Sequence, residues 1–370
     1  MPGCWREGIG RMAKLPIRLD GAKRILLVKP SALGDVVHTL PVVATLHRRY
    51  PSVLLDWLVE EAAAPLVQGH PAVAEVIVSG RRRWLDQLRR GREIRAALRE
   101  ISAFRRALLR RRYDAVLDLQ GLFKSALYVL ATRAPIRVGL ADGREGSRWA
   151  LTHRVPVPPQ PVHAVERYLA LAAAVDAGEP VREFTIPIGP QDLQIAEDLL
   201  ADCPRPRVVL HPATRWPTKL WEVERWRRLA GSLTADGAAV ILTGSVVDEG
   251  VAGEIAQGME PSLRSLVGKL SLKQLAAVLG TVDLMISVDS GPMHIAAAMG
   301  TPVVALFGPT DPARTGPLGP GTVLRQPLQC SPCLQRRCRI ADTYRCMRDL
   351  DVEAVAYAAR ELLALRAGGK

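Results

Sequence analysis

The sequence predicts an α/β protein built from two doubly wound, Rossmann-like domains. Short apolar runs of the kind that form buried parallel strands alternate with segments of helical periodicity along the chain. Polar turns that contain glycine follow several of these runs, as they do where open α/β sheets bind ligands. The length of 370 residues suits two domains that each bury their own core.

The first half supplies the elements of one sheet. Residues 1–21 carry no strong pattern, and we expect a poorly ordered extension there, ahead of a domain spanning 22–180. Runs rich in Val, Ile and Leu predict strands at 24–29, 54–59, 73–78, 113–119 and 136–140. Helical periodicity predicts helices at 36–50, in a basic segment up to 112, at 122–132 and at about 163–177.

The second half repeats this alternation. Gly and Pro gather between Gly178 and Pro190, so we place the interdomain linker at about 178–192 and the second domain at 190–350. Its expected strands are 207–211, 238–244, 263–267, 283–288 and 302–308. Its expected helices are 221–235, 248–257, 271–279 and 295–300. A last helix is expected within residues 351–370.

Composition limits the class of protein. With 48% apolar and 24% charged residues, the chain is typical of a soluble globular protein. Its apolar runs are shorter than the roughly 18 residues that a membrane-spanning helix needs. The first 21 residues lack the apolar core of a secretory signal, so we expect a cytoplasmic protein. No zinc-finger, basic-zipper or RNP pattern predicts nucleic-acid binding.

Positive charge is concentrated in one part of the sequence. The chain has 50 Lys and Arg against 37 Asp and Glu, a net charge of +13, which favours anionic partners. Much of the excess lies at 81–83, 89–92 and 105–112, around apolar residues at helical spacing. Two interpretations are open: a solvated basic face on an amphipathic helix, or a docking surface for an anionic membrane or substrate.

The stretch Ser287–His294 has the pattern of an anion-binding turn. An apolar run precedes it, and a short helical segment and a second apolar run follow it. A turn at the carboxyl end of a strand presents backbone N–H groups and a positive helix end, which suits a phosphate or diphosphate. The alternative is plain architecture, with Gly291 for backbone freedom and Pro292 at the first helical position.

Asp35 stands in a similar turn after the first predicted strand. The stretch Pro30–Asp35 leads from that strand into a helix. A carboxylate near a helix N-terminus is favoured by the helix dipole and can cap free N–H groups. Capping is therefore one reading of Asp35, and a catalytic carboxylate is another.

Five stretches together resemble the heptosyltransferases of glycosyltransferase family nine. They are 29–41, 118–125, 211–214, 287–294 and 307–312, and the resemblance spans about residues 24–365. It implies the GT-B architecture, two Rossmann-like domains facing a cleft, with the acceptor on the first and the nucleotide sugar on the second. It also implies transfer of heptose from ADP-L-glycero-D-manno-heptose to the Kdo/heptose inner core of lipopolysaccharide, with inversion and without a metal or other cofactor.

The resemblance assigns roles to single residues. It implies Asp35 as the base that takes a proton from the acceptor hydroxyl. It implies Lys219 as the cation that stabilises the departing ADP, with Arg215 as the alternative. Donor contacts are implied for Thr214, Arg215, Asp248, Asp289, Ser290, Gly291, Pro292, Met293 and His294. For Lys219 a solvated loop position, and for His294 packing in a helix interface, are the other readings.

Arginines are implied to hold the acceptor, a phosphorylated Kdo-lipid A, by pairing with its anionic groups. They are Arg82, Arg83, Arg144 and Arg167. The segments 81–84 and 163–167 resemble the first heptosyltransferase of the pathway more than the second. The implied location is the cytoplasmic face of the inner membrane, with peripheral contact between the basic surface and anionic lipid.

Four cysteines lie close together near the C-terminus, in a segment that resembles second-type heptosyltransferases. They are Cys330, Cys333, Cys338 and Cys346. Four thiolates bind Zn²⁺ in reducing compartments, so a zinc site is one interpretation. The other is a loop of reduced, buried thiols.

Two further hypotheses compete with this function. One is a family member that uses another nucleotide sugar or another acceptor. The other is a non-catalytic nucleotide-sugar-binding protein, which the presence of Asp35 and the Lys219 loop disfavours. A Rossmann oxidoreductase is disfavoured because the turns at Gly34 and Gly291 do not belong to a Gly-x-Gly-x-x-Gly pattern.

Overall fold

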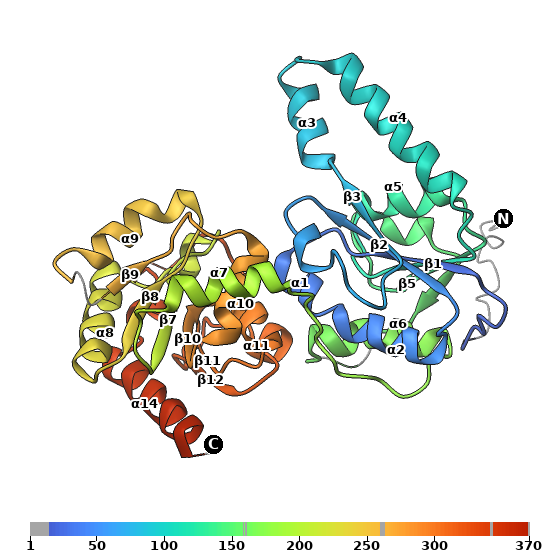
Figure 1. The fold of residues 1–370 in the computed structure, drawn as a ribbon. Coiled ribbons are helices and arrows are strands. Elements are labelled where there is room, and N and C mark those ends of the chain that lie inside the picture. The colour runs from blue at the N-terminus through green and yellow to red at the C-terminus, as the bar shows by residue number, and fades with distance from the viewer. Residues whose placement is uncertain (1–14, 158, 160, 260–262, 341–342, 369–370) are drawn as a thin grey trace, which may run out of the picture. The chain divides into compact units, whose positions relative to one another are not determined.

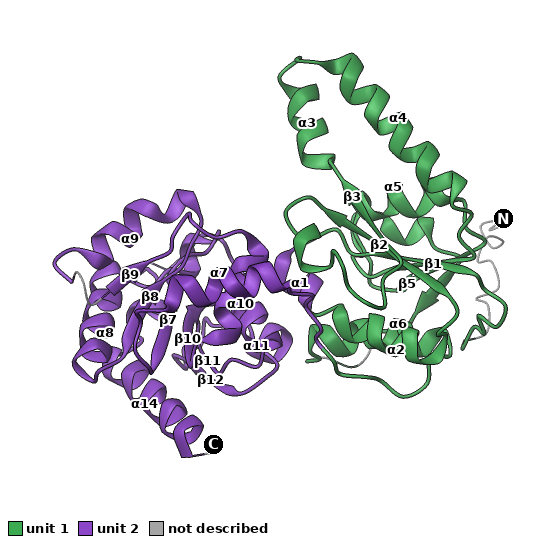
Figure 2. Ribbon diagram, viewed as in Figure 1, with its two compact units in different colours: residues 1–31, 38–183 green, residues 32–37, 184–370 purple. Residues whose placement is uncertain are grey.

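A computed structural model describes residues 15–157, 159, 161–259, 263–340 and 343–368. The chain forms two compact units, drawn in different colours in Figure 2. Unit 1 comprises the residues up to Ser31 together with His38–Glu183, and unit 2 comprises Ala32–Val37 together with Phe184–Lys370. The main crossing between units, after Glu183, falls within the stretch where Gly and Pro predict a linker.

Unit 1 contains a six-stranded parallel sheet in the order β3-β2-β1-β4-β5-β6 (Figure 1). Its strands are β1 Arg24–Val28, β2 Leu54–Glu60, β3 Glu75–Ser79, β4 Ala115–Asp118, β5 Ile136–Leu140 and β6 His153–Val155. Val28 at the end of β1 pairs with Leu58 of β2 and with Asp118 of β4. The strand order reverses between β1 and β4, so the crevice outside their carboxyl ends is the expected ligand position.

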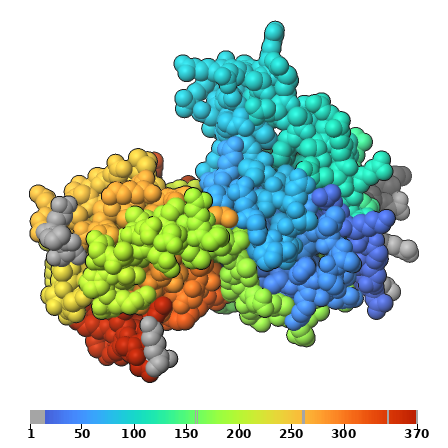
Figure 3. Space-filling model, in the orientation of Figure 1, coloured from blue at the N-terminus to red at the C-terminus, as the bar shows by residue number. Residues whose placement is uncertain are grey.

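Helices cover both faces of this sheet. On one face, α2 packs against α6, and on the other α4 packs against α3 and α5. Their bounds are α2 Leu40–Arg49, α3 Arg81–Arg89, α4 Ile94–Arg110, α5 Phe123–Thr132 and α6 Ala164–Ala174. The helices α3 and α4 form a hairpin that projects from the sheet of unit 1 (Figures 1 and 3). Short 3₁₀ turns follow β2 and β5, η1 Ala64–Leu66 and η2 Ser147–Ala150.

Unit 2 repeats the topology of unit 1, with strand order β12-β11-β10-β7-β8-β9. Its strands are β7 Arg207–His211, β8 Ala239–Leu242, β9 Leu263–Ser265, β10 Leu284–Val288, β11 Val303–Phe307 and β12 Gly321–Arg325. All of its ladders are parallel. The order reverses between β7 and β10, and Ser287 of β10 pairs with His211 of β7 there. Both units are thus Rossmann-like, as the sequence predicts.

The helices of unit 2 also form two layers. On one side α8 packs against α9 and α14, and on the other α10 packs against α7 and α11. Their bounds are α7 Pro190–Leu200, α8 Val223–Ala235, α9 Glu249–Ala256, α10 Leu272–Thr281, α11 Gly291–Ala298 and α14 Val352–Gly368. Shorter elements are α1 Leu33–Val37, η3 Pro217–Lys219, η4 Val246–Asp248, α12 Pro312–Thr315 and α13 Arg345–Arg348. Val355 and Ala359 of α14 are buried in the core with Trp226, so this helix is part of unit 2.

Several elements differ from the sequence-based expectation. The helix expected at 36–50 is two helices, because Pro41 has no N–H to continue the first and instead starts α2. The basic segment is also two helices, separated by a turn in which Gly91 and Glu93 have positive φ. Helix α7 and the short strands β6 and β12 were not predicted.

The expectation of a poorly ordered extension over residues 1–21 is wrong for residues 15–21. Residues 1–14 lie outside the described ranges, but residues 15–21 pack on unit 1. Leu19 is buried, and the backbone N–H of Ile17 donates to the carbonyl of Ala174 over 2.8 Å. Across the described ranges, no helix combines the length and apolar character that crossing a bilayer requires.

Candidate active site

Asp289 is the centre of a polar cluster at the carboxyl ends of three strands of unit 2. Its carboxylate is buried and accepts hydrogen bonds from Lys219 Nζ and Thr310 Oγ1, each over 2.6 Å. Thr214 Oγ1 donates to the Asp289 carbonyl over 3.3 Å. These residues come from the segments after β7, β10 and β11, so parallel pairing brings them together although they are distant in sequence.

Lys219 lies among further groups that suit an anion. Its ammonium is 4.7 Å from the centroid of the Trp216 ring, and the Arg336 guanidinium is 5.0 Å from the same centroid. Thr218 Oγ1 donates to the Gln335 carbonyl over 2.9 Å, which ties η3 to the loop that carries Arg336. Two cations therefore lie at Trp216, where the sequence predicted one. Arg215, the predicted alternative to Lys219, is exposed.

Helix α11 begins directly after Asp289 and Ser290, with Pro292 in its first turn. Its N-terminal N–H groups and positive dipole end lie at the same sheet edge as the Asp289 cluster. The Met293 side chain is fully buried, so only its main chain is available to contact a bound ligand. His294 is also buried, which fits the packing interpretation of this residue.

The segment that carries Asp35 packs against α11. A Cβ atom on Gly34 would lie 2.4 Å from Cδ2 of His294, and one on Gly291 would lie 2.8 Å from Cβ of Leu33. Only glycine leaves room for these side chains to lie so close to the backbone. The sequence-based boundary assigned residues 22–180 to the first domain, whereas the structure groups Ala32–Val37 with unit 2.

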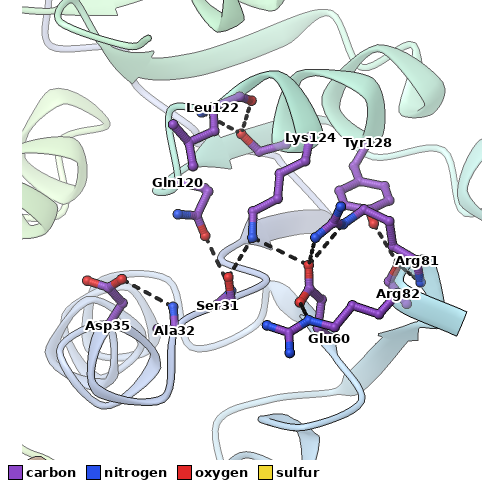
Figure 4. A network of polar contacts seen from close by, with 12 residues as sticks. Ser31, Ala32, Asp35, Glu60, Arg81, Arg82, Gln120, Leu122, Lys124 and Tyr128 are labelled. Carbon is purple, nitrogen blue, oxygen red and sulfur yellow. Dashed lines mark hydrogen bonds and ion pairs between the residues drawn. The ribbon is translucent and has the colours of Figure 1, made fainter. Parts of the chain in front are cut away.

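Asp35 is the third residue of α1. Its Oδ2 accepts a hydrogen bond from the backbone N–H of Ala32 over 3.1 Å (Figure 4). The predicted capping role is therefore present in the structure. A carboxylate has several acceptor sites, so this hydrogen bond does not by itself prevent Asp35 from taking a proton, and it is compatible with the catalytic interpretation.

A second polar network lies at the carboxyl ends of β1 and β2 in unit 1 (Figure 4). The buried Glu60 carboxylate accepts from Nε of Arg81 and of Arg82, both over 3.0 Å, and from Lys124 Nζ over 3.4 Å. Lys124 also donates to Ser31 Oγ. Burial raises the pKa of Glu60, but the Lys124, Arg81 and Arg82 charges outweigh burial and hold this pKa below its usual value.

This Glu60 network carries three cations against one carboxylate, so it is electropositive. Burial lowers the pKa of Lys124, and the neighbouring Glu60 charge opposes that shift. The acceptor contacts expected from the sequence include Arg82 but not Arg81, Glu60 or Lys124. Lys124 could have been predicted, because it falls in the motif 118–125. Glu60 carried no sequence signal beyond its place at a strand end.

The structure separates the other predicted acceptor residues. Arg83 pairs with Glu100 of α4 over 2.7 Å. Arg167 on α6 binds both carboxylate oxygens of Asp142, over 2.7 and 3.0 Å. Arg144 is exposed in the loop after β5. Arg144 therefore lies in the loop after β5 and Arg167 binds that loop through Asp142, whereas Arg83 is held within the hairpin of α3 and α4.

Asp248 forms hydrogen bonds within its own loop. Its Oδ2 accepts from the N–H of Ser245 over 2.8 Å and from the Ser245 hydroxyl over 2.6 Å. Nearby, Nδ1 of His211 and Oγ1 of Thr243 are 3.1 Å apart. Burial lowers the pKa of His211 to about 4, although the Asp248 charge and Thr243 act in the opposite direction. His211 is therefore neutral at neutral pH.

The Cys346 thiol is affected both by burial and by the other three C-terminal cysteines. Burial raises the pKa of the Cys346 thiol, and the Cys333, Cys330 and Cys338 charges raise it further. Among the residues that the structure describes, no three His, Cys, Asp or Glu side chains are grouped so that they could hold a metal ion. The zinc site stays a sequence-based hypothesis, which metal analysis of protein purified without added zinc tests.

Known proteins are similar to this chain over most of its length. A family model described as glycosyltransferase family 9 (heptosyltransferase) matches residues 101–343. Lipopolysaccharide heptosyltransferase 1 of Pseudomonas aeruginosa is 38% identical over 334 residues, which are 86% of this chain and 88% of that protein. The protein of the same name in Escherichia coli K12 is 35% identical over 305 residues, 80% of this chain and 91% of that protein.

Solved structures show the same architecture. The structure of E. coli heptosyltransferase WaaC with ADP is similar, with a TM-score of 0.71 and 31% identity. The match covers 92% of this chain and 99% of that one. Together with the two parallel sheets, this likeness confirms the predicted pair of Rossmann-like domains of the GT-B class.

Proposed function

Because the chain belongs to glycosyltransferase family 9, the heptosyltransferases, we propose that it transfers heptose from ADP-L-glycero-D-manno-heptose to the Kdo-containing inner core of lipopolysaccharide, with inversion. Relatives named lipopolysaccharide heptosyltransferase 1 support the acceptor class. A similar structure solved with ADP supports an adenine nucleotide donor. The observation that carries the proposal is the Lys219–Asp289–Thr310 cluster beside the N-terminus of α11.

On the donor side, the diphosphate would bind at the α11 N-terminus. As the anomeric C–O bond breaks, negative charge develops on the departing ADP. Lys219, oriented by the buried carboxylate of Asp289, would stabilise that charge together with the N–H groups of Ser290 and Gly291. Arg336 would supply a second cation from across Trp216. The polar residues Thr214, Arg215, Asp248 and His294 remain proposed donor contacts, with Pro292 and Met293 contributing only shape or main chain.

On the acceptor side, Asp35 would act as the base. It would take the proton of the attacking sugar hydroxyl while that oxygen bonds to the anomeric carbon and ADP leaves from the opposite face. This single displacement inverts the anomeric configuration. The packing of α1 on α11 supports the assignment, because it places the Asp35 segment in the same unit as the donor cluster.

Phosphate groups of the acceptor would meet the electropositive Glu60 network. Arg81, Arg82 and Lys124 are held there by one buried carboxylate, and their remaining N–H groups suit phosphate oxygens. Arg83, Arg144 and Arg167 remain proposed as further contacts to the anionic groups of the acceptor. Such an acceptor is anchored in the cytoplasmic leaflet of the inner membrane, so we place the enzyme at that face as a peripheral protein.

The test is incubation with ADP-heptose and Kdo-lipid A, with UDP and GDP sugars as controls and mass detection of the product. We expect one heptose to be added from ADP-heptose only. Asp35→Asn should bind ADP like the native protein and turn over at least about 100-fold more slowly. Transfer from another sugar would favour a different donor, and ADP-heptose binding without transfer would favour a non-catalytic binding protein.

A further inference from the structure

Helix α5 of unit 1 exposes an apolar stripe. Phe123, Leu127 and Leu130 are spaced at i, i+4 and i+7, so they lie on one helical face. Their exposed fractions are 56%, 52% and 51%. The opposite face of α5 is buried in the core through Ala126 and Val129. The core contacts of α5 are made by the other face, so packing within unit 1 does not account for the exposed apolar stripe.

A tryptophan extends this stripe. The 3₁₀ turn η2 packs against α5, and its Trp149 is 78% exposed while the next residue, Ala150, is buried in the core. An exposed Trp beside three exposed large apolar side chains is unusual for a surface that faces only water. We call Phe123, Leu127, Leu130 and Trp149 the α5 patch.

Arginines surround the α5 patch. Arg133 caps the C-terminal end of α5, Arg148 precedes Trp149, and the Arg154 guanidinium is 5.8 Å from the centroid of the Trp149 ring. All three are exposed. The nearby acid Glu145 is engaged by the backbone N–H of Phe123, over 3.2 Å. Apolar side chains that include Trp, set among arginines, are the composition of a surface that binds anionic lipid.

The α5 patch starts beside the electropositive Glu60 network. Phe123 is adjacent in sequence to Lys124, which turns inward to Ser31 and Glu60. The loop that carries Arg144 is tied to the same end of α5, because the Arg144 N–H donates to the Gly121 carbonyl over 2.9 Å. A bilayer against the patch would therefore lie next to the proposed acceptor groups.

We propose that the α5 patch docks this enzyme on an anionic phospholipid bilayer, with Phe123, Leu127, Leu130 and Trp149 entering the interfacial region and the three arginines pairing with headgroup phosphates. This inference rests on the proposed function, because a lipid-anchored acceptor gives docking its purpose. A second copy of the chain fits less well, since two such patches would bring their arginines together and like charges repel.

Vesicle co-sedimentation of the full chain tests the proposal. The vesicles are phosphatidylcholine alone or phosphatidylcholine with phosphatidylglycerol, at low and high salt. We expect binding to the anionic vesicles, weakened by salt, and a loss of at least about tenfold in Leu127→Ser/Trp149→Ser. The matched control is Tyr357→Ser/Leu365→Ser on α14, where the side chains are 63% and 72% exposed. It should bind like the native chain.

Tryptophan fluorescence supplies a second readout. Trp149→Phe keeps an apolar ring, so we expect it to retain vesicle binding and to lose the blue shift that vesicles induce in the native protein. Native-like vesicle binding by Leu127→Ser/Trp149→Ser would overturn the proposal. So would a native dimer that this variant converts to a monomer, because the patch would then be covered by a second copy.

The proposed function and the docking proposal can be refuted independently of each other. Transfer to a water-soluble, deacylated acceptor should be unchanged in Leu127→Ser/Trp149→Ser, because none of these side chains belongs to the catalytic clusters. If the native protein transfers heptose to that acceptor but does not bind anionic vesicles, docking is wrong and the function stands. If vesicles bind and no transfer occurs, the proposed function is wrong.

Discussion

Gly34→Ala should destabilise unit 2 and slow turnover, because the added methyl group has no room. Its carbon would lie 2.4 Å from Cδ2 and 3.0 Å from Nε2 of His294. Carbon atoms in contact normally stay about 3.5 Å or more apart. His294 is only 5% exposed, so its ring has little space in which to move away. The overlap must be relieved by a shift of α1 against α11.

The size of the effect follows from this overlap. Overpacking of a filled site costs about 1–3 kcal/mol. Each kcal/mol lowers the Tm of a domain of this size by about 2–4 °C, so we expect a fall of about 2–12 °C. Asp35 moves with α1, and a displacement of about 1 Å near reacting groups can cost roughly 100-fold in rate. We therefore expect kcat to fall on the order of tenfold to 100-fold.

Thermal unfolding and steady-state heptose transfer measure the two effects. Gly231→Ala is the matched control, because Gly231 lies inside α8 and nothing is within 4 Å of an added Cβ. Its Tm should stay level or rise, since Ala favours a helix interior over Gly by about 0.5–1 kcal/mol. Combining Gly34→Ala with His294→Ala should remove most of the penalty of the first change. A native Tm and kcat in Gly34→Ala alone would refute the close approach of α1 and α11.

Three further changes test the two polar clusters and the buried histidine. Lys219→Ala should lower kcat for heptose transfer on the order of 100-fold or more, because it removes the cation that faces the departing phosphate, while Lys219→Arg keeps part of the rate. Glu60 has a pKa below its usual value near 4.5 in the folded protein, so its stabilising effect is complete above that value and is lost as the pH falls through the folded pKa. Glu60→Gln should therefore lower the Tm at neutral pH and lessen the further fall in acid, as measured by thermal unfolding from pH 7 to well below 4.5. His211 has a pKa of about 4 in the folded protein against 6.5 when unfolded, so the unfolded chain binds the proton first and acidification between these values costs up to about 3 kcal/mol of stability. In His211→Asn, urea unfolding should show a smaller loss over the same pH range.

The predictions for Lys219, Glu60 and His211 would each be contradicted by a specific result. Native kcat in a correctly folded Lys219→Ala protein would exclude Lys219 from leaving-group stabilisation and would direct attention to Arg336. A Glu60→Gln variant with native Tm at neutral pH would mean that the surrounding cations need no counter-charge. Equal acid sensitivity of the native protein and His211→Asn would show that other groups control unfolding in this range.

The location of the candidate site could be read largely from residue order. The turn at Ser287–His294 and the Lys219 loop each follow a predicted strand of the second sheet, and polar turns at the ends of parallel strands gather at one sheet edge, whereas the Asp35 turn follows a strand of the first sheet. Their partners could not be predicted. Thr310 and Arg336 reach the cluster from loops whose paths no periodicity describes, and Glu60 joins Arg81, Arg82 and Lys124 only through the folded sheet.

The sequence by itself determined the class of fold and the strands that build it, because a strand buried on both faces must be apolar along its length and its turns must be polar. Only the tertiary structure decided which unit holds the Asp35 segment and which charges neutralise one another. Those outcomes depend on close contacts between residues far apart in the chain, such as Gly34 with His294 and Lys219 with Asp289. A local sequence pattern contains no information about such distances.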